Sequence, residues 1–544
     1  MLSGRERYLT SRRLLSQLLA CLLLVSIFSV AAPRTTATTP TAHAPIFING
    51  NADFTAANGV TGGTGTSADP YVISYWDINL HQGGQWGDCG PDPSDCILVC
   101  SAPYCLGIQV QNTRAYFVIQ NVSIHDGYPN SLDISFSNVT NGQVESSNLT
   151  SYSGISIINS GNVTVSGNNV AIPQYSLGAH SGYDDGPGLQ IGSSSYVTIS
   201  GNSFTVWREP DIRLTGDSNL VISNNNFVGS SSTNNSQALD MTNLVNSTIQ
   251  NNQITDTDLG FIVDGGNFSG NVLSGNVFSG NGYYSTTEGI SFGPSTQLSS
   301  NIITTDNLVE GRPIYYFEQC SGTSINGVPV GELLVVNCSN FQASNLSFDG
   351  TAFEDIVMFS VHGGSVTNSD LHASVFGLFA WNSDHVTVSS NNVTSGNGIQ
   401  FYNTDNMFVY HNNFLCAGSG CDTATDYLGT NNLWDNGYPS GGNFWWNYPG
   451  VDNCSGPQQN VCPNPDGIAD TAFGHDRYPL MKPFVASPDP SPSVGGAVVP
   501  VDKLALLGPF VLLAMPVAAG TVLIALYSKR IKTNKGKMRE RPIA

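Results

Sequence analysis

Short runs of alternating apolar and polar residues, separated by turn residues, recur along most of this chain. Each repeat holds two such runs, and an Asn pair commonly closes the second. The clearest repeats start at Gly154, Gly188, Asp211, Ala238, Gly377 and Gly398. The first four starts lie 34, 23 and 27 residues apart, and the last two lie 21 apart. Alternation with a period of two indicates β-strands, and self-similar strands at this period indicate a solenoid.

One such unit cannot bury its apolar side chains alone. Stacked on an identical unit, its backbone pairs in parallel, and its Ile, Val and Leu side chains form continuous internal ladders. Asn tolerates left-handed backbone geometry at the corners, and its amide can stack on the next Asn. We therefore predict an all-β, right-handed parallel β-helix, with about 14 coils between Cys105 and Cys416. A leucine-rich repeat is the alternative, but helix-forming stretches and its leucine spacing are missing.

Two segments depart from this rhythm. Residues 282–340 contain RPIYYFEQCSGTSINGVPVGELLVVNCSN, which predicts a lateral excursion with the helix resuming at Glu332. Residues 431–480 crowd aromatic residues, Gly, Asn and Asp together, which is the composition of a rigid loop structure. Because a solenoid must cover its apolar end, we expect this block to cap the array.

Composition agrees with strands and turns. Charged residues make up only 11%, and the net charge is −21. Residues 35–528 hold seven basic and 38 acidic residues, because most of the basic ones lie in the two tails. Such a surface repels nucleic acid and favours cations or neutral, hydroxyl-rich ligands. An acidic surface that serves solubility alone is the simpler alternative.

Membrane signals bracket the chain. Four arginines precede an apolar run at 14–30, which predicts a signal peptide or a short N-terminal anchor. Leu504–Tyr527 has no charge over 24 residues, enough to cross a bilayer as a helix. The basic segment that follows places the C-terminus in the cytoplasm by the positive-inside rule. We therefore expect the region between to be extracellular, on a single C-terminal membrane span.

Cysteine usage supports export. Ten cysteines follow the leader in short-range groups, an even count that predicts a disulfide framework. These groups are Cys89/Cys96/Cys100/Cys105, Cys320/Cys338, Cys416/Cys421 and Cys454/Cys462. Zinc is the alternative for the first group, but its spacing lacks the tight C-x2-C pair of zinc sites. Eleven N-x-S/T sequences are compatible with a glycosylated exterior.

These observations give a division of the chain. The predicted segments are a signal peptide or anchor at 1–32, a Thr/Pro linker at 33–45, an N-terminal cap with disulfides at 46–105, a parallel β-helix at 106–416, a C-terminal cap at 417–486, a second linker at 487–503, a transmembrane helix at 504–527 and a basic cytoplasmic tail at 528–544.

The NNVTVSGNN-type units, the RPIYY…VNCSN insert and the end NLWDNGYPSGGNFWW…DGIADT…YPLM resemble a known family. They are similar to NosD-like surface proteins, which carry the carbohydrate-binding and sugar-hydrolase β-helix domain and are often archaeal. The resemblance covers roughly residues 105–485. It implies a pectin-lyase-like solenoid.

The C-terminal block contains a candidate cation loop. Calcium loops place oxygen ligands at alternate positions around a Gly turn. In NPDGIAD, Asn464, Asp466, the Ile468 carbonyl and Asp470 have that spacing. Family members carry a more acidic run directly after a GVD motif, whereas here about ten residues separate Asp452 from the loop. A Cys454–Cys462 disulfide would return Asp452 to it. We predict a calcium site of modest affinity, with a metal-free Asn/Asp turn as the alternative.

Alignment of the repeats predicts a second site. If the apolar residues point inward, alternation turns Gln190, Arg213 and Asp240 outward in one vertical column. The loop before Gly188 adds Asp184 and Asp185. Carboxylates with an arginine are the groups that polysaccharide-cleaving enzymes use, so Asp184, Asp185, Arg213 and Asp240 are candidate catalytic residues. A sugar-binding groove and a plain surface ion-pair ladder are the alternatives.

Aromatic and histidine residues add weaker signals. Some aromatic residues could stack on sugar rings, whereas Trp434, Phe444, Trp445 and Trp446 are expected to plug the end of the helix. The candidates for stacking are Trp207, Phe379, Trp381, Tyr402, Trp434, Trp445 and Trp446. The nine histidines form no cluster with metal-ligand spacing, so copper is not expected.

Together these features predict a membrane-anchored, cell-surface β-helix protein that binds glycans or other surface polymers without catalysis. An anchored polysaccharide lyase or glycoside hydrolase is one alternative. A structural envelope or adhesion spacer is the other.

Overall fold

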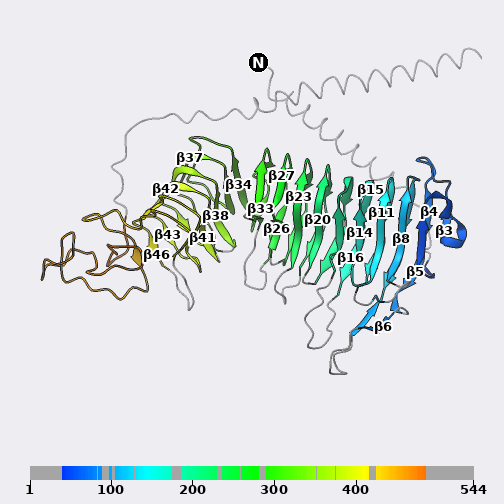
Figure 1. Cartoon of the computed structure of the whole chain (residues 1–544), viewed down its shortest axis with the longest axis horizontal. Helices are drawn as coiled ribbons and strands as arrows, with labels where there is room; N and C mark the ends of the chain where they lie inside the picture. Colours follow the sequence, from blue (N-terminus) through cyan, green and yellow to red (C-terminus); the bar gives the residue numbers. More distant parts are fainter. Residues whose placement is uncertain are drawn as a thin grey trace, which may run out of the picture. The chain divides into compact units, whose positions relative to one another are not determined.

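The structure is a computed structural model that describes residues 39–485, with gaps at 82–83, 88–96, 101–104, 128–129, 174–185, 208, 230–235, 258, 281–288, 294, 349, 351, 374 and 416–423. The described chain forms two parallel β-helices joined in series (Figure 1). We call residues 41–309 the first helix and residues 312–445 the second helix. The predicted all-β solenoid is confirmed, since the only helices described are two short 3₁₀ turns, η1 (Asn51–Asp53) and η2 (Ala56–Asn58).

Three parallel ladders build the first helix, and each ladder takes one strand from every coil. Its first ladder is β2 (Ile46–Asn49), β8 (Leu106–Thr113), β11 (Leu132–Val139), β14 (Ile155–Ile158), β17 (Leu189–Gly192), β20 (Pro210–Ser218), β23 (Gln237–Val245), β26 (Leu259–Val263) and β30 (Ile290–Phe292). Its second ladder is β4 (Tyr71–Ser74), β9 (Phe117–Gln120), β12 (Gly142–Glu145), β15 (Gly161–Ser166), β18 (Ser195–Ser200), β21 (Val221–Ser223), β24 (Thr248–Gln250), β28 (Val272–Ser274) and β32 (Ile302–Ile303), with β27 (Gly266–Ser269) paired to β31 (Thr296–Ser299) beside it.

The third ladder closes each coil. It is β5 (Trp76–Asn79), β10 (Ser123–His125), β13 (Asn148–Thr150), β16 (Asn169–Ile172), β19 (Ser203–Val206), β22 (Asn226–Val228), β25 (Gln253–Thr255), β29 (Val277–Ser279) and β33 (Leu308–Val309). Four short strands lie outside this pattern: β1 (Thr41–Ala42) pairs with β5, β3 (Val60–Gly62) with β4, and β6 (Gly84–Gly87) with β7 (Ile97–Cys100). The predicted N-terminal cap at 46–105 therefore supplies strands of the first coil.

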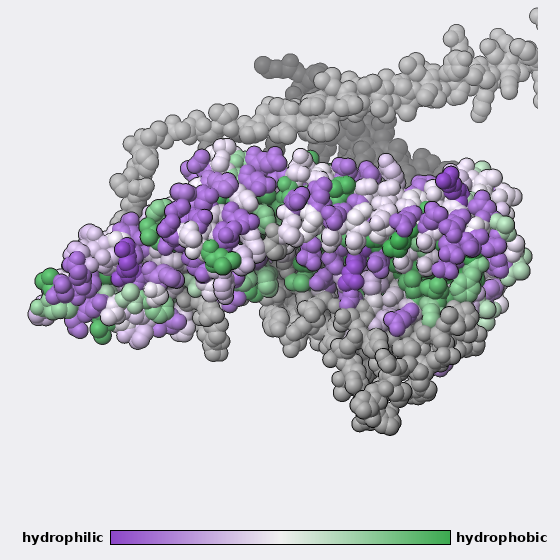
Figure 2. Space-filling view, in the orientation of Figure 1, coloured by the Kyte–Doolittle hydropathy of each residue, from purple (hydrophilic) through white to green (hydrophobic). Residues whose placement is uncertain are grey.

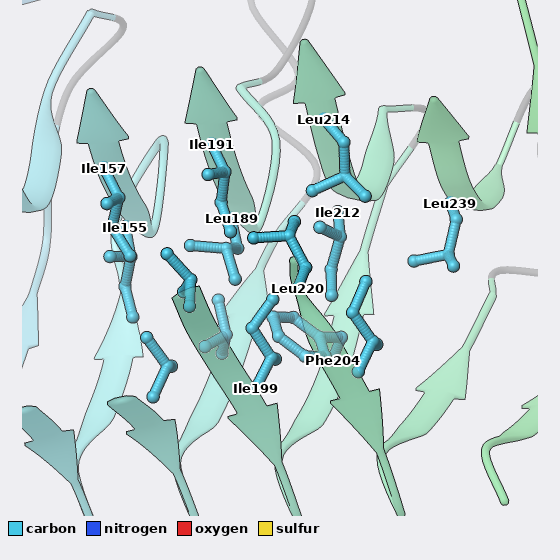
Figure 3. Packing of buried hydrophobic residues seen from close by; sticks show 14 of the residues in the cluster. Ile155, Ile157, Leu189, Ile191, Ile199, Phe204, Ile212, Leu214, Leu220 and Leu239 are labelled. Atoms are coloured by element: carbon cyan, nitrogen blue, oxygen red, sulfur yellow. The ribbon is translucent and has the colours of Figure 1, made fainter. Parts of the chain in front are cut away.

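Alternation along each strand sends apolar side chains into the bore (Figure 3). Ile155, Leu189, Ile212 and Leu239 are in register on successive coils, and each is at most 1% exposed. Parallel pairing therefore stacks aliphatic side chains on aliphatic side chains of the next coil, as the repeat alignment predicts. Burial of each such side chain stabilises the fold by about 1.5–3 kcal/mol.

Each turn that carries an Asn of the ladder divides two tasks between neighbouring residues. The residue before the ladder Asn commonly takes left-handed geometry, as in Asn224 (φ 56°) and Asn251 (φ 55°). The ladder Asn itself is buried, and its Oδ1 accepts both the backbone N–H and the Nδ2–H of the Asn one coil earlier. This ladder runs through Asn168, Asn202, Asn225, Asn252, Asn276 and Asn307. The stacked amides thus satisfy backbone groups that the turn would otherwise leave unpaired.

The second helix repeats the three-ladder plan. Its first ladder is β34 (Arg312–Glu318), β36 (Glu332–Val336), β38 (Glu354–Phe359), β41 (Phe376–Trp381), β44 (Ile399–Tyr402) and β47 (Ala424–Tyr427). Its second is β35 (Ser324–Asn326), β37 (Ser339–Ser344), β39 (His362–Thr367), β42 (Asp384–Ser389) and β45 (Phe408–Tyr410), and its third is β40 (Asp370–Leu371), β43 (Asn392–Val393), β46 (Asn413–Phe414) and β48 (Phe444–Trp445).

A tight hairpin joins the two helices. Its turn is Glu310–Gly311, with φ angles of 47° and 79°, and it pairs β33 with β34 in the antiparallel sense. Within the predicted lateral excursion at 282–340, the strands that the structure describes, β30 to β36, all pair within the ladders and do not leave them. The repeat pattern of the sequence changes here because the chain leaves the coils of the first helix and begins those of the second.

The outer face of the second helix covers the end of the first. All five residues of β36 are buried: Leu334 and Val336 pack into the core of the first helix, and Leu333 and Val335 into that of the second. The Glu332 carboxylate accepts the backbone N–H groups of Gly289 and Ile290 at 2.6 and 3.1 Å. Glu318 does the same for Ser300 and Asn301 at 2.6 and 2.9 Å. Carboxylates thus satisfy the free N–H groups at the end of the first helix.

The C-terminal block, residues 431–480, closes the C-terminal end of the second helix. Trp434 and Trp445 are 3% and 5% exposed, and their rings pack on Phe401 and Phe414. These two therefore plug the bore as predicted, whereas Phe444 is half-buried and Trp446 is 45% exposed. The β-helix ends at Trp445 rather than at the predicted residue 416.

A buried carboxylate locks this cap in place. Asp476 accepts hydrogen bonds from the Asn443 backbone N–H and the Trp445 Nε1–H, both at 2.8 Å. Asn443 is itself the last amide of a ladder that begins with Asn391 and Asn412. Asp476 thus stands where the next coil would supply another Asn. Burial raises its pKa to about 6, and its hydrogen bonds oppose that rise.

The disulfides Cys320–Cys338 and Cys454–Cys462 are present, as the cysteine grouping predicts. The side chains of Cys89, Cys96, Cys100, Cys416 and Cys421 lie outside the described residues. So do the predicted leader at 1–32, most of the first linker, and the linker, transmembrane helix and tail from 487 onward. Within the described ranges no helix is long and apolar enough to cross a membrane.

Candidate functional site

The predicted polar column exists on the outer face of the first ladder. Gln190 of β17 is in register with Arg213 of β20, and Arg213 with Asp240 of β23. All three side chains are partly exposed, whereas their neighbours along each strand are buried. The register of the repeats, read from the sequence, thus places these residues correctly.

Arg213 is held between two carboxylates. Its Nε donates to Asp240 Oδ2 at 3.1 Å, and its Nη2 donates to Glu209 Oε2 at 2.8 Å. The side chain of Arg213 is 35% exposed, against 14% for Glu209 and 22% for Asp240. Glu209 directly precedes β20 and lies four residues before Arg213 in the chain. The Arg213 guanidinium thus pairs with a carboxylate on its own strand's N-terminal side and with one on the next coil.

The other two candidate catalytic residues, Asp184 and Asp185, lie outside the described residues. Asp211, next to the column in sequence, points into the wall and is 2% exposed. Burial raises its pKa well above the ordinary value, and a backbone hydrogen bond from Val206 opposes that rise. Asp133 is buried in the same way. Both acids are inaccessible to a polymer on the surface.

Five of the seven aromatic residues proposed for stacking fall into two groups. Trp434 and Trp445 are buried in the cap, whereas Phe379, Trp381 and Tyr402 lie on the outer face of the second helix. There, Trp381 and Tyr402 stack with ring centroids 4.1 Å apart and planes 17° apart. Tyr427, which the sequence analysis did not single out, continues this column from the last strand, β47.

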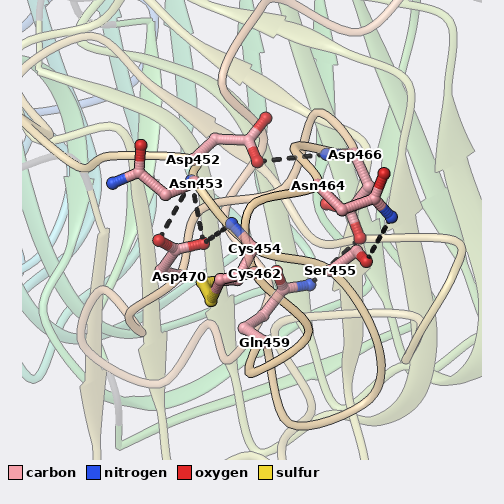
Figure 4. Close-up of a disulfide and its surroundings, with 9 residues drawn as sticks. All are labelled: Asp452, Asn453, Cys454, Ser455, Gln459, Cys462, Asn464, Asp466 and Asp470. Atoms are coloured by element: carbon pink, nitrogen blue, oxygen red, sulfur yellow. Dashed lines mark hydrogen bonds between the residues drawn. A yellow bond between two sulfur atoms is a disulfide. The ribbon is translucent and has the colours of Figure 1, made fainter.

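The predicted cation loop is organised by backbone N–H groups (Figure 4). The two carboxylate oxygens of Asp452 accept from Asp466 and Gly467 at 3.0 and 2.7 Å. Asp466 Oδ1 accepts from the Ile468 N–H at 3.1 Å, which closes the turn. The Cys454–Cys462 disulfide thus accompanies the expected return of Asp452 to the loop.

The remaining residues of the loop face other partners. Asp470 accepts from the backbone N–H groups of Asn453 and Cys454, both at 3.0 Å, and Asn464 donates to Ser455 Oγ at 2.8 Å. Among the residues described, no three carboxylate, histidine or cysteine side chains converge closely enough to hold a metal ion. Calcium binding at this loop stays a prediction.

Two histidines share one carboxylate on the second helix. His362 Nδ1 lies 2.7 Å from Asp384 Oδ2, and His385 Nδ1 lies 2.8 Å from Asp384 Oδ1. Slight burial raises the pKa of Asp384, but the hydrogen bonds from the two imidazoles outweigh it, so the net pKa is lowered. Both rings are about 60% exposed, which is the surface arrangement expected of histidines with satisfied partners.

Comparison with known proteins agrees with this fold. Residues 180–328 match the family model described as "Right handed beta helix region". No curated protein matches the sequence. Among solved structures, a mutant tailspike protein of E. coli bacteriophage HK620 is 12% identical over 66% of this chain and 71% of its own, with a TM-score of 0.35. The Streptococcus pneumoniae surface protein and adhesin PfbA is 13% identical over 59% and 85%, with a TM-score of 0.26.

The periplasmic alginate epimerase AlgG is 13% identical over 63% of this chain and 85% of its own, with a TM-score of 0.25. The ladders and the family match together define the class: this is a parallel β-helix protein, with a right-handed β-helix region at 180–328. Its function has to be argued from its own surface.

Proposed function

We propose that this chain is a cell-surface β-helix protein that binds glycans without cleaving them. The observation that carries the proposal is the strip formed by Gln190, Arg213 and Asp240, on successive coils of one flat sheet face. Such coils lie about 4.8 Å apart, so the strip offers amide, guanidinium and carboxylate groups in a fixed row. A hydroxyl-rich polymer can form repeated hydrogen bonds with a row of this kind.

The visible surface of the described chain suits a hydrated ligand. The face of the described chain in view is mainly hydrophilic, with hydrophobic residues in small separate patches (Figure 2). An acidic surface with few cations repels nucleic acid and other polyanions. Neutral polymers carry no such penalty.

Binding is favoured over catalysis by the state of the charged groups. A polysaccharide lyase or glycoside hydrolase needs a carboxylate that is free to exchange a proton with the substrate. Asp240 is engaged by Arg213, and Arg213 is engaged a second time by Glu209. A purely structural spacer would share this arrangement, so retention of a glycan is the property that separates the two proposals.

The proposed location rests on the sequence beyond residue 486. Leu504–Tyr527 is long and apolar enough to span a bilayer, and the basic segment after it favours the cytoplasm. On this proposal the β-helices stand outside the membrane on a short linker.

A bead pull-down tests the proposed function. Full-length protein in detergent is passed over beads coated with a panel of neutral and acidic polysaccharides. We expect retention on at least one of them, and weaker retention for Arg213→Ala. Arg114→Ala, which removes an exposed cation elsewhere on the first helix, is the matched control. Equal retention of both variants would reject the strip, and no retention on any polysaccharide would reject glycan binding.

A further inference from the structure

The second helix presents an outer sheet face without charge. On the last three strands of its first ladder, the outward positions are Phe379 and Trp381 of β41, Gln400 and Tyr402 of β44, and Thr425 and Tyr427 of β47. Four of the six are aromatic, and the other two are an amide and a hydroxyl.

Exposure rises steadily along this face. The column Phe359, Trp381, Tyr402 and Tyr427 is in register from β38 to β47. Phe359 is 8% exposed beneath the end of the first helix, Trp381 and Tyr402 are half-buried, and Tyr427 is 50% exposed. The rings therefore leave the interface between the two helices and emerge at the end of the ladder.

The geometry of the rings shows where a ligand has room. Trp381 and Tyr402 lie almost parallel with centroids 4.1 Å apart, so each covers a face of the other. Tyr427 is tilted by 44° from Tyr402, at a centroid distance of 6.4 Å. Because β47 is the last strand of its sheet, no further ring follows within the described chain. Tyr427 is thus the open end of the stack, next to Leu428, which is 69% exposed.

Polar groups beside the stack are free to bind a ligand. Within the described part of the chain, the side chains of Gln400, Thr425, Tyr402 and Tyr427 form no hydrogen bond. An aromatic face surrounded by unpaired hydroxyl and amide groups matches a pyranose ring, which has an apolar C–H face and a rim of hydroxyls. Among the six outward positions described here, none is an arginine or lysine that would attract a uronate or a sulfated sugar.

We infer that Tyr427, with Gln400 and Thr425, forms a binding site for a neutral pyranose of an oligosaccharide. The inference rests on the proposed glycan binding and adds a second site and a substrate class. The sugar stacks on the Tyr427 ring, and the amide of Gln400 and the hydroxyl of Thr425 bind its hydroxyl groups. The site is separate from the strip at Arg213, which lies on the first helix.

Titration of the full-length protein in detergent tests this site. The probes are cellotetraose, mannotetraose and chitotetraose, with tetragalacturonate as the charged comparison. We expect at least one neutral probe to bind, and Tyr427→Ala to weaken its binding by about tenfold. Tyr427→Phe, which keeps the ring and loses only the hydroxyl, should bind more tightly than Tyr427→Ala. Gln400→Ala, which leaves the aromatic stack intact, should also weaken binding.

Controls separate this inference from the proposed function. Tyr196→Ala removes a tyrosine that is 65% exposed on the first helix, and it should leave binding unchanged. Neutral-probe binding that survives Tyr427→Ala and Gln400→Ala would overturn the site while leaving glycan binding intact. Binding of tetragalacturonate alone, lost in Arg213→Ala, would overturn the substrate class and support the strip. If no neutral probe binds, the site is rejected, and the bead pull-down decides the proposed function independently.

Discussion

At the scale of single residues, buried carboxylates distinguish this β-helix from a simple apolar stack. Asp133 and Asp211 occupy the same position on their coils, where Gly154 and Gly188 stand on the two coils between them. Strict alternation fails at the start of β20, where the first three residues are all buried.

The buried carboxyl group of Asp476 should make the stability of the folded protein depend on pH. Its folded-state pKa of about 6 exceeds the ordinary 3.8, so the folded protein holds this proton more tightly than the unfolded chain. Its contribution to stability is complete below about pH 4 and falls as the pH rises toward 6, by at most about 3 kcal/mol. Asp476→Asn cannot ionise, and it keeps one acceptor oxygen in place of the two that accept from Tyr478, Asn443 and Trp445.

We therefore expect the Tm difference between wild type and Asp476→Asn to shrink or reverse as the pH is raised from 4 to 7. Thermal melts at half-unit intervals measure this difference. Asp264→Asn, at an exposed position, is the control and should give a difference that is nearly constant. A constant difference for Asp476→Asn as well would show that its carboxyl is not held protonated.

At the scale of elements, alternation predicted most of the strands, and repeat alignment predicted the register of Gln190, Arg213 and Asp240. The joint between the helices escaped prediction for a physical reason. The segments ELLVV and DIVMF of β36 and β38 are buried on nearly all sides, so they show continuous apolar runs in place of alternation. The stacking of Tyr427 also could not be predicted, because residues 416–423 interrupt the repeat just before its strand.

The Asn ladder is the element that fixes the coil register. Asn225 accepts two hydrogen bonds from Asn202 and donates to the Ile199 carbonyl and to Asn252. Asn225→Ala leaves these buried groups unsatisfied, which should cost about 1–3 kcal/mol of stability. Chemical denaturation measures the loss. Asn226→Ala, at the exposed neighbouring position, should cost far less, and equal losses would show that the ladder adds nothing specific.

The C-terminal loop carries the calcium prediction. If Asp466 is a calcium ligand, Asp466→Ala should lower the Tm only when calcium is present, because ligand binding stabilises the folded state. Melts in calcium and in chelator test this. An equal loss in both would show that Asp466 only closes the turn through the Ile468 N–H, and it would reject the metal.

At the scale of the whole molecule, the described chain is two β-helices whose outer faces differ in chemistry. The first carries a charged strip at Arg213, and the second carries an uncharged aromatic face that ends at Tyr427. If the C-terminal segment anchors this structure outside the cell, protease treatment of intact cells should release fragments of residues 39–485. Full protection on intact cells, with cleavage after lysis, would contradict the proposed location.

The most direct measurement of the central claim follows a defined glycan through binding and recovery. Full-length protein is incubated with each polysaccharide that it retains, and the bound polymer is eluted and sized, while reducing ends and unsaturated products are assayed in the same samples. The account predicts retention of polymer that is recovered at its original length. Shortened chains or new reducing ends would contradict binding without cleavage, and failure to retain any glycan would contradict the proposed function.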